Sequence, residues 1–359
     1  MEWLRLIRTR NVGPATFVTL LSQFGSASRA LEALPDLARR GGRQGGISIA
    51  GKAEAEAELA AAARFGARYI ASSEPEYPPA LAAIDAPPPL LCVKGAVHLL
   101  QRPTLAIVGA RNASAAGIRI ARELSHALGQ QGFLIASGLA RGIDAAAHAG
   151  ALESGTAGVL AGGIDVIYPP QNEELHHRIG EIGVLICELP PGAQPQARHF
   201  PQRNRIISGV SMGVMIIEAA PRSGSLITAR YAGEQGREVL VVPGSPLDPR
   251  SRGGNALIRQ GATLVQTSED VLEALQPLLR TPFAEPERKP PFSPAVLDMP
   301  VVDRARPEII EMLGPTPIEI DELVRQSGLG PGVIALILLE LDLAGRLERL
   351  PGQRVALSG

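Results

Sequence analysis

The stretch Leu105-Ala-Ile-Val-Gly-Ala-Arg111 decides the fold class, together with a second stretch, Phe133-Leu-Ile-Ala-Ser-Gly-Leu-Ala-Arg-Gly-Ile-Asp144. Each begins with four apolar residues and continues into glycine and arginine, and a helical segment at residues 115–130 separates them. Apolar runs without alternation are typical of parallel strands that are covered on both faces. Two such strands joined by a helix predict part of a parallel α/β sheet.

The same pattern continues to about residue 280. Further strands are predicted at residues 157–160, 184–187, 214–217, 239–242 and 263–265, and further helices at residues 143–153 and 225–235. Short apolar strands that alternate with helices are typical of a doubly wound sheet. The sequence therefore predicts a Rossmann-like core of mostly parallel strands over residues 67–280.

The segments on either side of this core have other patterns. Residues 1–66 predict a small helical domain, either a helix-hairpin-helix or SAM-like fold or a plain helical packing module. Residues 281–303 form a Pro-rich linker, and residues 304–359 resemble a winged helix. Its third helix, residues 333–344, is almost wholly apolar and has no Arg or Lys. A helix that reads bases presents polar and basic side chains, so this one is interpreted as a packing or protein-contact helix.

Basic residues are concentrated in one part of an almost neutral chain. The formal net charge is −1, yet residues 191–262 hold nine Arg against four acidic residues, and residues 151–190 hold six acidic residues against one Arg. A local basic segment of this kind favours a polyanion site. Nearly all basic residues are Arg, which binds phosphates bidentately, although a GC-rich genome would give the same bias. Aromatic residues make up only 3%, so a base-stacking surface would depend on few rings.

We expect a cytoplasmic protein. No segment reaches the roughly 18 apolar residues that a membrane span needs, and the first residues lack the apolar run of a signal peptide. Cys92 and Cys187 fit a reducing compartment, and Cys187 is expected to be buried in a strand.

Gly, Ser and Arg gather where the predicted strands end, which is where open parallel sheets bind ligands. After the first strand, Gly109 would allow close backbone approach and Arg111 would project a cation towards the start of the next helix. After the second strand, Ser137 and Gly138 would form an anion cradle beside Arg141.

A third group combines one ring with two guanidinium groups. Its candidate ligands are Phe200, Arg203, Asn204 and Arg205. Single-stranded nucleic acids need this combination, because bases stack on rings and cations track the backbone. The alternative is a helix start whose arginines pair with Glu188 and Glu218.

One more helix begins with a turn of the kind that binds phosphate, formed by Ser223, Gly224 and Ser225.

Three residues are expected to hold the loops in place, namely Asp144, His148 and Glu218. No nucleophile or metal ligand stands near the Asp144–His148 pair in sequence, so we predict no catalytic residues, no metal and no cofactor. The dinucleotide fingerprint GxGxxG is missing, which argues against a nicotinamide enzyme.

Taken in order, these motifs resemble the DNA-processing protein A family (DprA, also called Smf). The matching strings are Tyr77-Pro78, Asp85-Ala-Pro-Pro-Pro-Leu90, Val108-Gly-Ala-Arg111, Ser137-Gly-Leu-Ala-Arg-Gly-Ile-Asp144, Gly162-Gly-Ile-Asp165, Tyr168-Pro169, Phe200-Pro-Gln-Arg-Asn-Arg205, Ser223-Gly-Ser-Leu-Ile-Thr228 and Val242-Pro-Gly244. They span essentially the whole core, so the resemblance is specific.

The resemblance implies a dimeric protein that binds single-stranded DNA and loads the recombinase RecA onto it during natural transformation. The phosphate contacts that it implies come from Arg111, Ser137, Gly138, Arg141, Arg203 and Arg205, and the ring that it implies for base stacking is Phe200. The chain departs from the family at Ala110 and Cys187, where Ser is usual. Ala110 removes one possible hydroxyl contact from the crevice.

A competing interpretation is a nucleotide hydrolase of the lysine-decarboxylase-like or phosphoribohydrolase class, which shares the sheet and the Gly-rich loops. Its PGGxGTxxE-like loop has a catalytic Glu that is missing from Pro221-Arg-Ser-Gly-Ser-Leu-Ile-Thr228. A homodimer contact is predicted at Leu257 and Ile258, with the nearby Leu264-Val265 pair.

Overall fold

The computed structural model describes residues 1–280, 299–350 and 352–358, which divide into two compact units. Met1–Glu56 and Glu287–Gly359 belong to one, here named the terminal unit, and Ala57–Pro286 to the other, the core unit. Most of the predicted linker, residues 281–298, lies outside the described residues.

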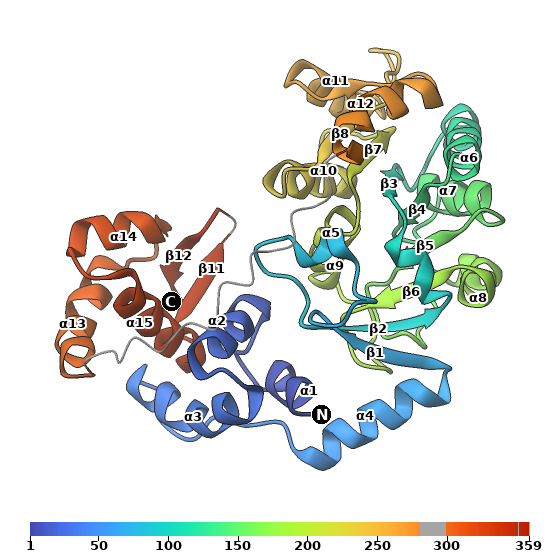
Figure 1. Cartoon of the computed structure of the whole chain (residues 1–359). Coiled ribbons are helices and arrows are strands. Elements are labelled where there is room, and N and C mark those ends of the chain that lie inside the picture. Colours follow the sequence, from blue (N-terminus) through green and yellow to red (C-terminus); the bar gives the residue numbers. More distant parts are fainter. Residues whose placement is uncertain (281–298, 351, 359) are drawn as a thin grey trace. The chain divides into compact units, whose positions relative to one another are not determined.

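The core unit is built on a nine-stranded sheet (Figure 1). In spatial order its strands are β1 (Ala67–Ala71), β2 (Leu90–Gly95), β6 (Val184–Cys187), β5 (Thr156–Val159), β4 (Leu134–Ser137), β3 (Thr104–Gly109), β7 (Gly213–Ile217), β8 (Glu238–Val241) and β9 (Thr263–Leu264). All neighbours from β6 to β9 are parallel, which confirms the predicted Rossmann-like sheet.

The sequence prediction missed β1 and β2, which pair antiparallel at one edge of the sheet. β1 mixes buried and half-exposed positions, and β2 follows three consecutive prolines, so neither has the surroundings of a buried parallel strand. Cys187 is buried in β6 as predicted, and its register partner on β2 is Cys92, also buried. Both are free thiols.

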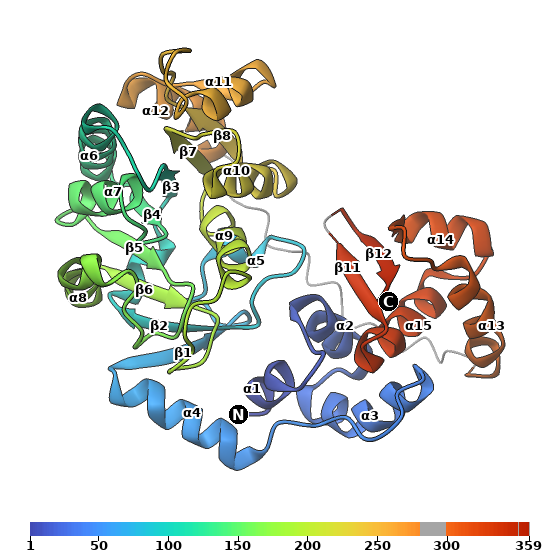
Figure 2. The same ribbon diagram turned by 180° about the vertical axis from the view of Figure 1, so that it is seen from behind.

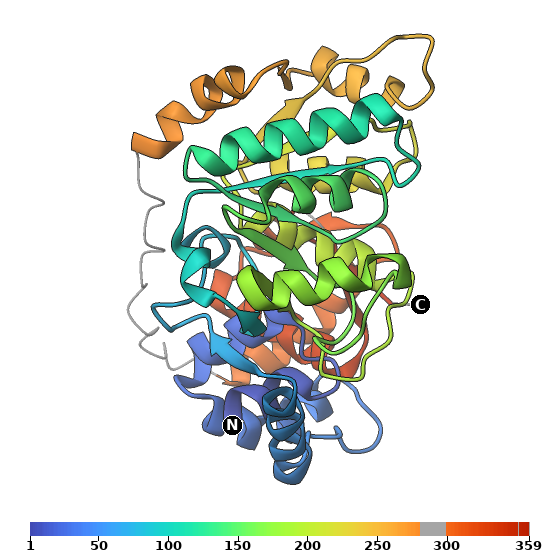
Figure 3. The same cartoon turned by 90° about the vertical axis from the view of Figure 1, so that its right-hand side faces the viewer.

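Helices cover both faces of this sheet. On one face lie α6 (Ala115–Gln130), α7 (Ile143–Ala151), α8 (Glu173–Ile182) and α12 (Ser268–Arg280), and Figure 3 looks onto the first three. On the other lie α5 (Pro79–Ala82), α9 (His199–Gly209) and α10 (Gly224–Glu234), seen in Figure 2. The remaining helices are α4 (Lys52–Arg64), before β1, and α11 (Arg252–Arg259), after β8. Successive strand residues alternate between the two layers, so that Val108 packs in one and Ile107 in the other.

The strand order reverses at β3, which has β4 on one side and β7 on the other. Connections leave such a reversal in opposite directions and open a crevice at the carboxyl ends of the strands. A Cβ at Gly109, the last residue of β3, would lie 1.8 Å from the carbonyl oxygen of Ile217, the last residue of β7. Only glycine therefore lets these two strand ends come so close, and the backbone that approaches Gly109 is that of β7.

The terminal unit combines the N-terminal helices with a winged helix. Its elements are α1 (Glu2–Arg8), α2 (Pro14–Phe24), α3 (Ala27–Arg40), α13 (Met299–Met312), β10 (Ile318–Glu319), α14 (Ile320–Ser327), α15 (Pro331–Ala344), β11 (Leu347–Leu350) and β12 (Arg354–Leu357). β11 and β12 form the predicted wing, to which β10 adds a third strand, and α13 begins inside the predicted linker. No helix in the described part of the chain combines the length and the apolarity that crossing a membrane would need.

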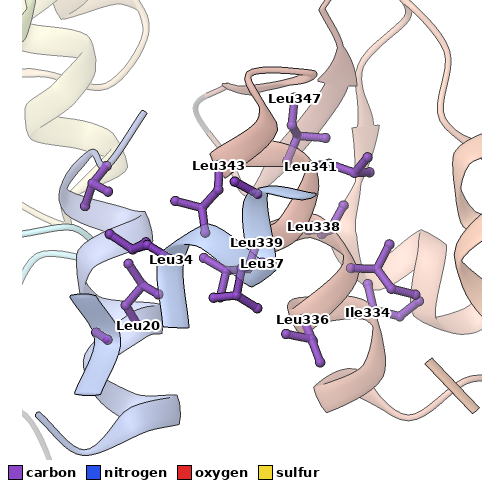
Figure 4. Close-up of a cluster of buried hydrophobic side chains, with 14 of the residues drawn as sticks. Leu20, Leu34, Leu37, Ile334, Leu336, Leu338, Leu339, Leu341, Leu343 and Leu347 are labelled. Carbon is purple, nitrogen blue, oxygen red and sulfur yellow. The ribbon is translucent and has the colours of Figure 1, made fainter. Parts of the chain in front are cut away.

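One hydrophobic core joins the N-terminal helices to the winged helix (Figure 4). It contains Leu34 and Leu37 of α3 and most of α15, which is apolar around its circumference and buried along its length. The hydroxyl of Thr16 donates to the Asp342 carboxylate over 2.5 Å at the same contact. The predicted packing role of residues 333–344 is confirmed, and the two segments that the sequence presents as separate domains share this core.

Gly41→Ala is expected to lower the free energy of unfolding of the terminal unit by about 1–3 kcal/mol, because it overpacks this core. A Cβ at Gly41 would lie 1.9 Å from the carbonyl oxygen of Glu340 on α15, so α3 and α15 would have to separate. Gly46→Ala is the control, since a Cβ there meets nothing within 4 Å. Trp3, the single Trp of the chain, lies in this unit and reports its denaturation by fluorescence. Equal denaturation midpoints for Gly41→Ala and Gly46→Ala would contradict a close contact between α3 and α15.

Candidate functional site

A groove of about 760 Å³ lies at the carboxyl ends of β3 and β7. It is lined by the loops after β3 and β4, by α9 and by the start of α10. Among the residues predicted to bind DNA, the groove brings together Gly109, Arg111, Phe200, Arg203, Asn204, Ser223, Gly224 and Ser225. Segments that are distant in the sequence thus meet at the strand reversal.

A smaller hollow of about 50 Å³ shares Arg111, Phe200 and Arg203 with the groove. It adds Arg141, from the loop after β4, and Tyr168, from the connection after β5. Two other predicted ligands, Ser137 and Arg205, line neither of these spaces.

Three exposed guanidinium groups stand at the groove and the hollow: Arg111, Arg141 and Arg222. Within the described residues, none of the three has an ion-pair partner, whereas Arg250, which also lines the groove, is paired with Asp248 at 2.8 Å. Exposed cations without a carboxylate partner can bind phosphate oxygens without breaking an internal bond. Sequence reasoning missed Arg222, although it directly precedes the Ser-Gly-Ser turn.

Phe200 lies between a cation and a second ring. The Cζ atom of Arg111 is 5.2 Å from the Phe200 ring centroid, and the Tyr168 ring is 5.6 Å away with its plane tilted by 55°. These are distances of cation–π and aromatic contacts. The three side chains come from three different connections, so only the tertiary fold assembles this cluster.

The carboxylate of Asp144 occupies the loop that was expected to cradle a phosphate. It accepts hydrogen bonds from the backbone N–H groups of Gly138 at 3.2 Å and Ala140 at 3.4 Å. Ser137 is fully buried, and its hydroxyl donates to a carbonyl of β3 at 2.6 Å. The Ser137 hydroxyl and the Gly138 N–H group already have internal acceptors, so the structure does not favour the predicted phosphate cradle, although Gly138 does line the small hollow. Arg141 is the exposed charged side chain of this loop.

A second internal carboxylate, that of Glu218, stands at the start of α6. Glu218 has a φ of 54° and accepts hydrogen bonds from the N–H group of Ser114, at 2.8 Å, and from its hydroxyl. Ser114 in turn caps α6 by accepting from Gly117 N–H at 3.0 Å. A negative charge at a helix N-terminus is stabilised by the helix dipole, so the protein itself supplies the anion at this helix start.

Arg203 and Arg205 are both engaged inside the core unit. Arg203 is only 6% exposed and donates to the carbonyl of Val159 at 2.8 Å. Arg205 donates to both carboxylate oxygens of Glu188, at 2.7 and 2.6 Å. Both predicted phosphate contacts would therefore compete with internal bonds: Arg203 lines the groove but is largely buried, and Arg205 forms the pair with Glu188 that the alternative interpretation named.

Asn204 and the start of α10 form another wall of the groove. The Asn204 side-chain amide donates to the carbonyl of Gly224 at 3.3 Å. Ser223 caps α10 by accepting from Ser225 N–H at 3.3 Å, and the two serine hydroxyls are 2.7 Å apart. Ser225 is buried and Gly224 is exposed, so the Gly224 backbone is the open part of this wall.

His148 is a buried structural residue on α7. Its Nδ1 is 2.7 Å from the hydroxyl of Thr156, which itself donates to a carbonyl of β4, so Nδ1 carries the shared hydrogen. Burial lowers the pKa of His148 to about 3, and the charge of Arg203 lowers it further in the same direction. The neutral ring thus links α7 to the start of β5.

The free energy of unfolding should fall by about 1.4 kcal/mol for each pH unit below 6.5 on account of His148. The unfolded chain protonates this histidine near its ordinary pKa of 6.5, while the folded protein keeps it neutral down to about 3. The unfolded state therefore binds more protons between these values, and stability is lost as the pH falls. Denaturation at several pH values should show a shallower slope for His148→Asn and an unchanged slope for His126→Gln, whose ring is exposed. Identical slopes for wild type and His148→Asn would exclude this role.

No three His, Cys, Asp or Glu side chains come close enough to hold a metal ion within residues 1–280, 299–350 and 352–358. The neighbouring rings of His176 and His177 are 5.9 Å apart, one buried and one exposed.

Three family models match the chain. The model described as DNA recombination-mediator protein A covers residues 68–276. A DprA-like N-terminal HHH domain covers residues 1–61, and a DprA winged helix domain covers residues 288–353.

Relatives and solved structures carry related names. The chain is similar to Protein Smf of Escherichia coli (strain K12), with 42% identity over 284 residues, which are 78% of this chain and 75% of that protein. It is 43% identical to DNA processing protein DprA of Bacillus subtilis (strain 168) over 231 residues, 64% of this chain and 77% of that protein. The X-ray structure of DprA from Streptococcus pneumoniae has a TM-score of 0.66 at 35% identity and covers 76% of this chain and 97% of its own. A DprA structure from Helicobacter pylori, described for its single-stranded DNA binding mode, has a TM-score of 0.54 at 28% identity and covers 58% of this chain and 96% of its own.

Proposed function

The chain belongs to the DNA-processing protein A (DprA/Smf) family, and from this premise we propose that it binds single-stranded DNA in the groove at the carboxyl ends of β3 and β7. Arg111, Arg141 and Arg222 contact phosphates in this proposal, and the Phe200 cluster meets the bases. The supporting observation is that three exposed guanidinium groups, none with an ion-pair partner in the described residues, line the groove or the small hollow that adjoins it, next to an aromatic pair. A single strand offers both a regular row of phosphates and unpaired base faces.

Titration of the full chain with an oligothymidylate and with a duplex of equal length tests this function. We expect tighter binding to the single strand. In a plot of the logarithm of the association constant against the logarithm of the salt concentration, the slope should fall by about 0.7 for each phosphate neutralised. Equal affinity for the duplex, or no binding to either DNA, would contradict the proposal.

A nucleotide hydrolase is the competing function, and two carboxylates do not favour it: Asp144, which lines the groove, and Glu218, at the start of α6. Asp144 and Glu218 both accept backbone N–H hydrogen bonds, which commits them to holding loops. A general acid or base must instead reach the reacting group of a substrate. We propose that the protein is not an enzyme, and release of free base from nucleoside monophosphates would overturn this.

We also propose that the protein loads RecA onto the bound strand during natural transformation. The description of the matching family model as a recombination mediator supports this. On DNA covered by a single-strand-binding protein, the chain should shorten the lag before RecA hydrolyses ATP. An unchanged lag would argue against loading.

A homodimer through α11 is a further part of this proposal. Leu257 and Ile258 are half-buried there, and Leu257 lines a second groove of about 750 Å³ together with Leu226 and Ala262. In sedimentation experiments, Leu257→Arg should shift the protein to monomer. The matched control is Ile182→Arg, at a residue that is 48% exposed on α8. If both variants sediment like wild type, the contact lies elsewhere.

A further inference from the structure

Tyr168 is an exposed ring at the edge of the proposed DNA site. It is 47% exposed, follows β5 in the chain and lines the small hollow together with Arg111 and Arg141. Phe200, with its ring 5.6 Å away, is half-buried. Tyr168 is thus the more accessible ring of the pair.

Neighbouring loops hold the connection that carries Tyr168. The side-chain amide of Asn172 donates to the carbonyls of Leu139 at 2.8 Å and Ala140 at 3.1 Å, in the loop that also carries Arg141. Asp165 accepts a hydrogen bond from Gly192 N–H at 2.7 Å. These contacts tie the connection to the loops after β4 and β6, so the ring has a defined place beside Arg141.

Phe200 is the less available surface for a base. The guanidinium group of Arg111 lies over its ring, and a base that took this place would have to displace this cation–π contact. Tyr168 has no such cation in the described part of the chain. Its neighbours Arg111 and Arg141 are both exposed, so phosphates of the same nucleotides have cations nearby.

We propose that Tyr168 stacks on an unpaired base of the bound strand and forms, with Arg141, a nucleotide subsite beyond the main groove. This rests on the proposed single-stranded DNA binding. Duplex DNA does not expose base faces, so a stacking ring at this place also favours single strands over duplexes.

The experiment compares Tyr168→Ala and Tyr168→Phe on two probes, an oligothymidylate and an abasic strand of the same length. Tyr168→Ala should weaken oligothymidylate binding by about 5- to 150-fold, the range for loss of one base–aromatic stack. Its salt slope should equal that of wild type, because no charge is removed. Tyr168→Phe keeps the ring and should restore binding. On the abasic strand, wild type and Tyr168→Ala should bind equally.

Tyr231→Ala is the matched control, since Tyr231 also neighbours an arginine, at 5.4 Å, but lines neither the groove nor the hollow. Full oligothymidylate affinity of Tyr168→Ala would overturn the inference while leaving the main groove as the site. An equal loss on both probes would also overturn it, since the ring would then only position Phe200 and Arg111. Failure of wild type to bind either strand would instead remove the proposed function itself.

Discussion

Arg203→Ala is expected to lower the free energy of unfolding of the core unit by about 1–3 kcal/mol, because it leaves the buried carbonyl of Val159 without its hydrogen-bond donor. Burial lowers the pKa of Arg203 to about 10, opposed by the nearby Asp144 carboxylate. Burial likewise raises the pKa of Asp144, opposed by Arg203. The two charges thus favour each other without forming an ion pair, and the truncated variant also removes this attraction from the buried Asp144 carboxylate.

Arg198→Ala provides the control, because Arg198 is exposed at the start of the same helix. Chemical denaturation of both variants measures the difference. Adding Asp144→Asn to Arg203→Ala should recover part of the lost stability, since neighbouring groups in one network are not additive. Wild-type stability of Arg203→Ala combined with weaker DNA binding would instead favour the phosphate contact that the sequence predicted.

The double variant Arg111→Ala/Arg141→Ala is expected to lose affinity for single-stranded DNA on the order of 25-fold at about 0.1 M salt. Two phosphate contacts on a single strand contribute about 1.4 to the slope of the logarithm of the association constant against the logarithm of the salt concentration. The variant should therefore show a slope that is smaller by this amount. Both side chains are exposed and without an ion-pair partner in the described residues, so folding stability should stay close to wild type.

Arg119→Ala/Arg122→Ala removes the same charge from exposed positions of α6 and controls for a general electrostatic effect. Anisotropy titrations at four or more salt concentrations would separate the two variants. If they change the slope equally, the strand does not lie in the groove.

Much of the core could be predicted from the sequence, because the features that determine it are local. The apolar run before Arg111 identifies β3, and the run before Ser137 identifies β4. The apolar composition of residues 333–344 likewise predicts a packing helix, since a helix without a polar face must be buried all round. β1 and β2 were missed because β1 mixes buried and exposed positions and β2 directly follows three prolines, so neither resembles the buried runs between helices that identified the parallel strands.

The candidate site could be predicted only in part. Sequence spacing identifies the glycines and guanidinium groups at the strand ends, and Arg111 and Phe200 do line one groove. It does not show that the Asp144 carboxylate accepts hydrogen bonds from backbone N–H groups of its own loop, or that Arg205 pairs with Glu188. A glycine turn is equally compatible with an internal carboxylate and with a bound phosphate, because both are anions that accept N–H hydrogen bonds.

The sequence by itself determined the class of sheet and the kinds of side chain that stand at the carboxyl ends of its strands, both of which follow from periodicity and neighbouring residues. Only the tertiary structure decided which of those side chains are exposed to a ligand and which already form hydrogen bonds or ion pairs inside the protein. It also brought Tyr168 to Phe200 and the first helices to the last. The physical reason is that hydrogen bonds, ion pairs and ring contacts depend on distances between atoms, and residues remote in the chain acquire those distances only when the whole fold has closed.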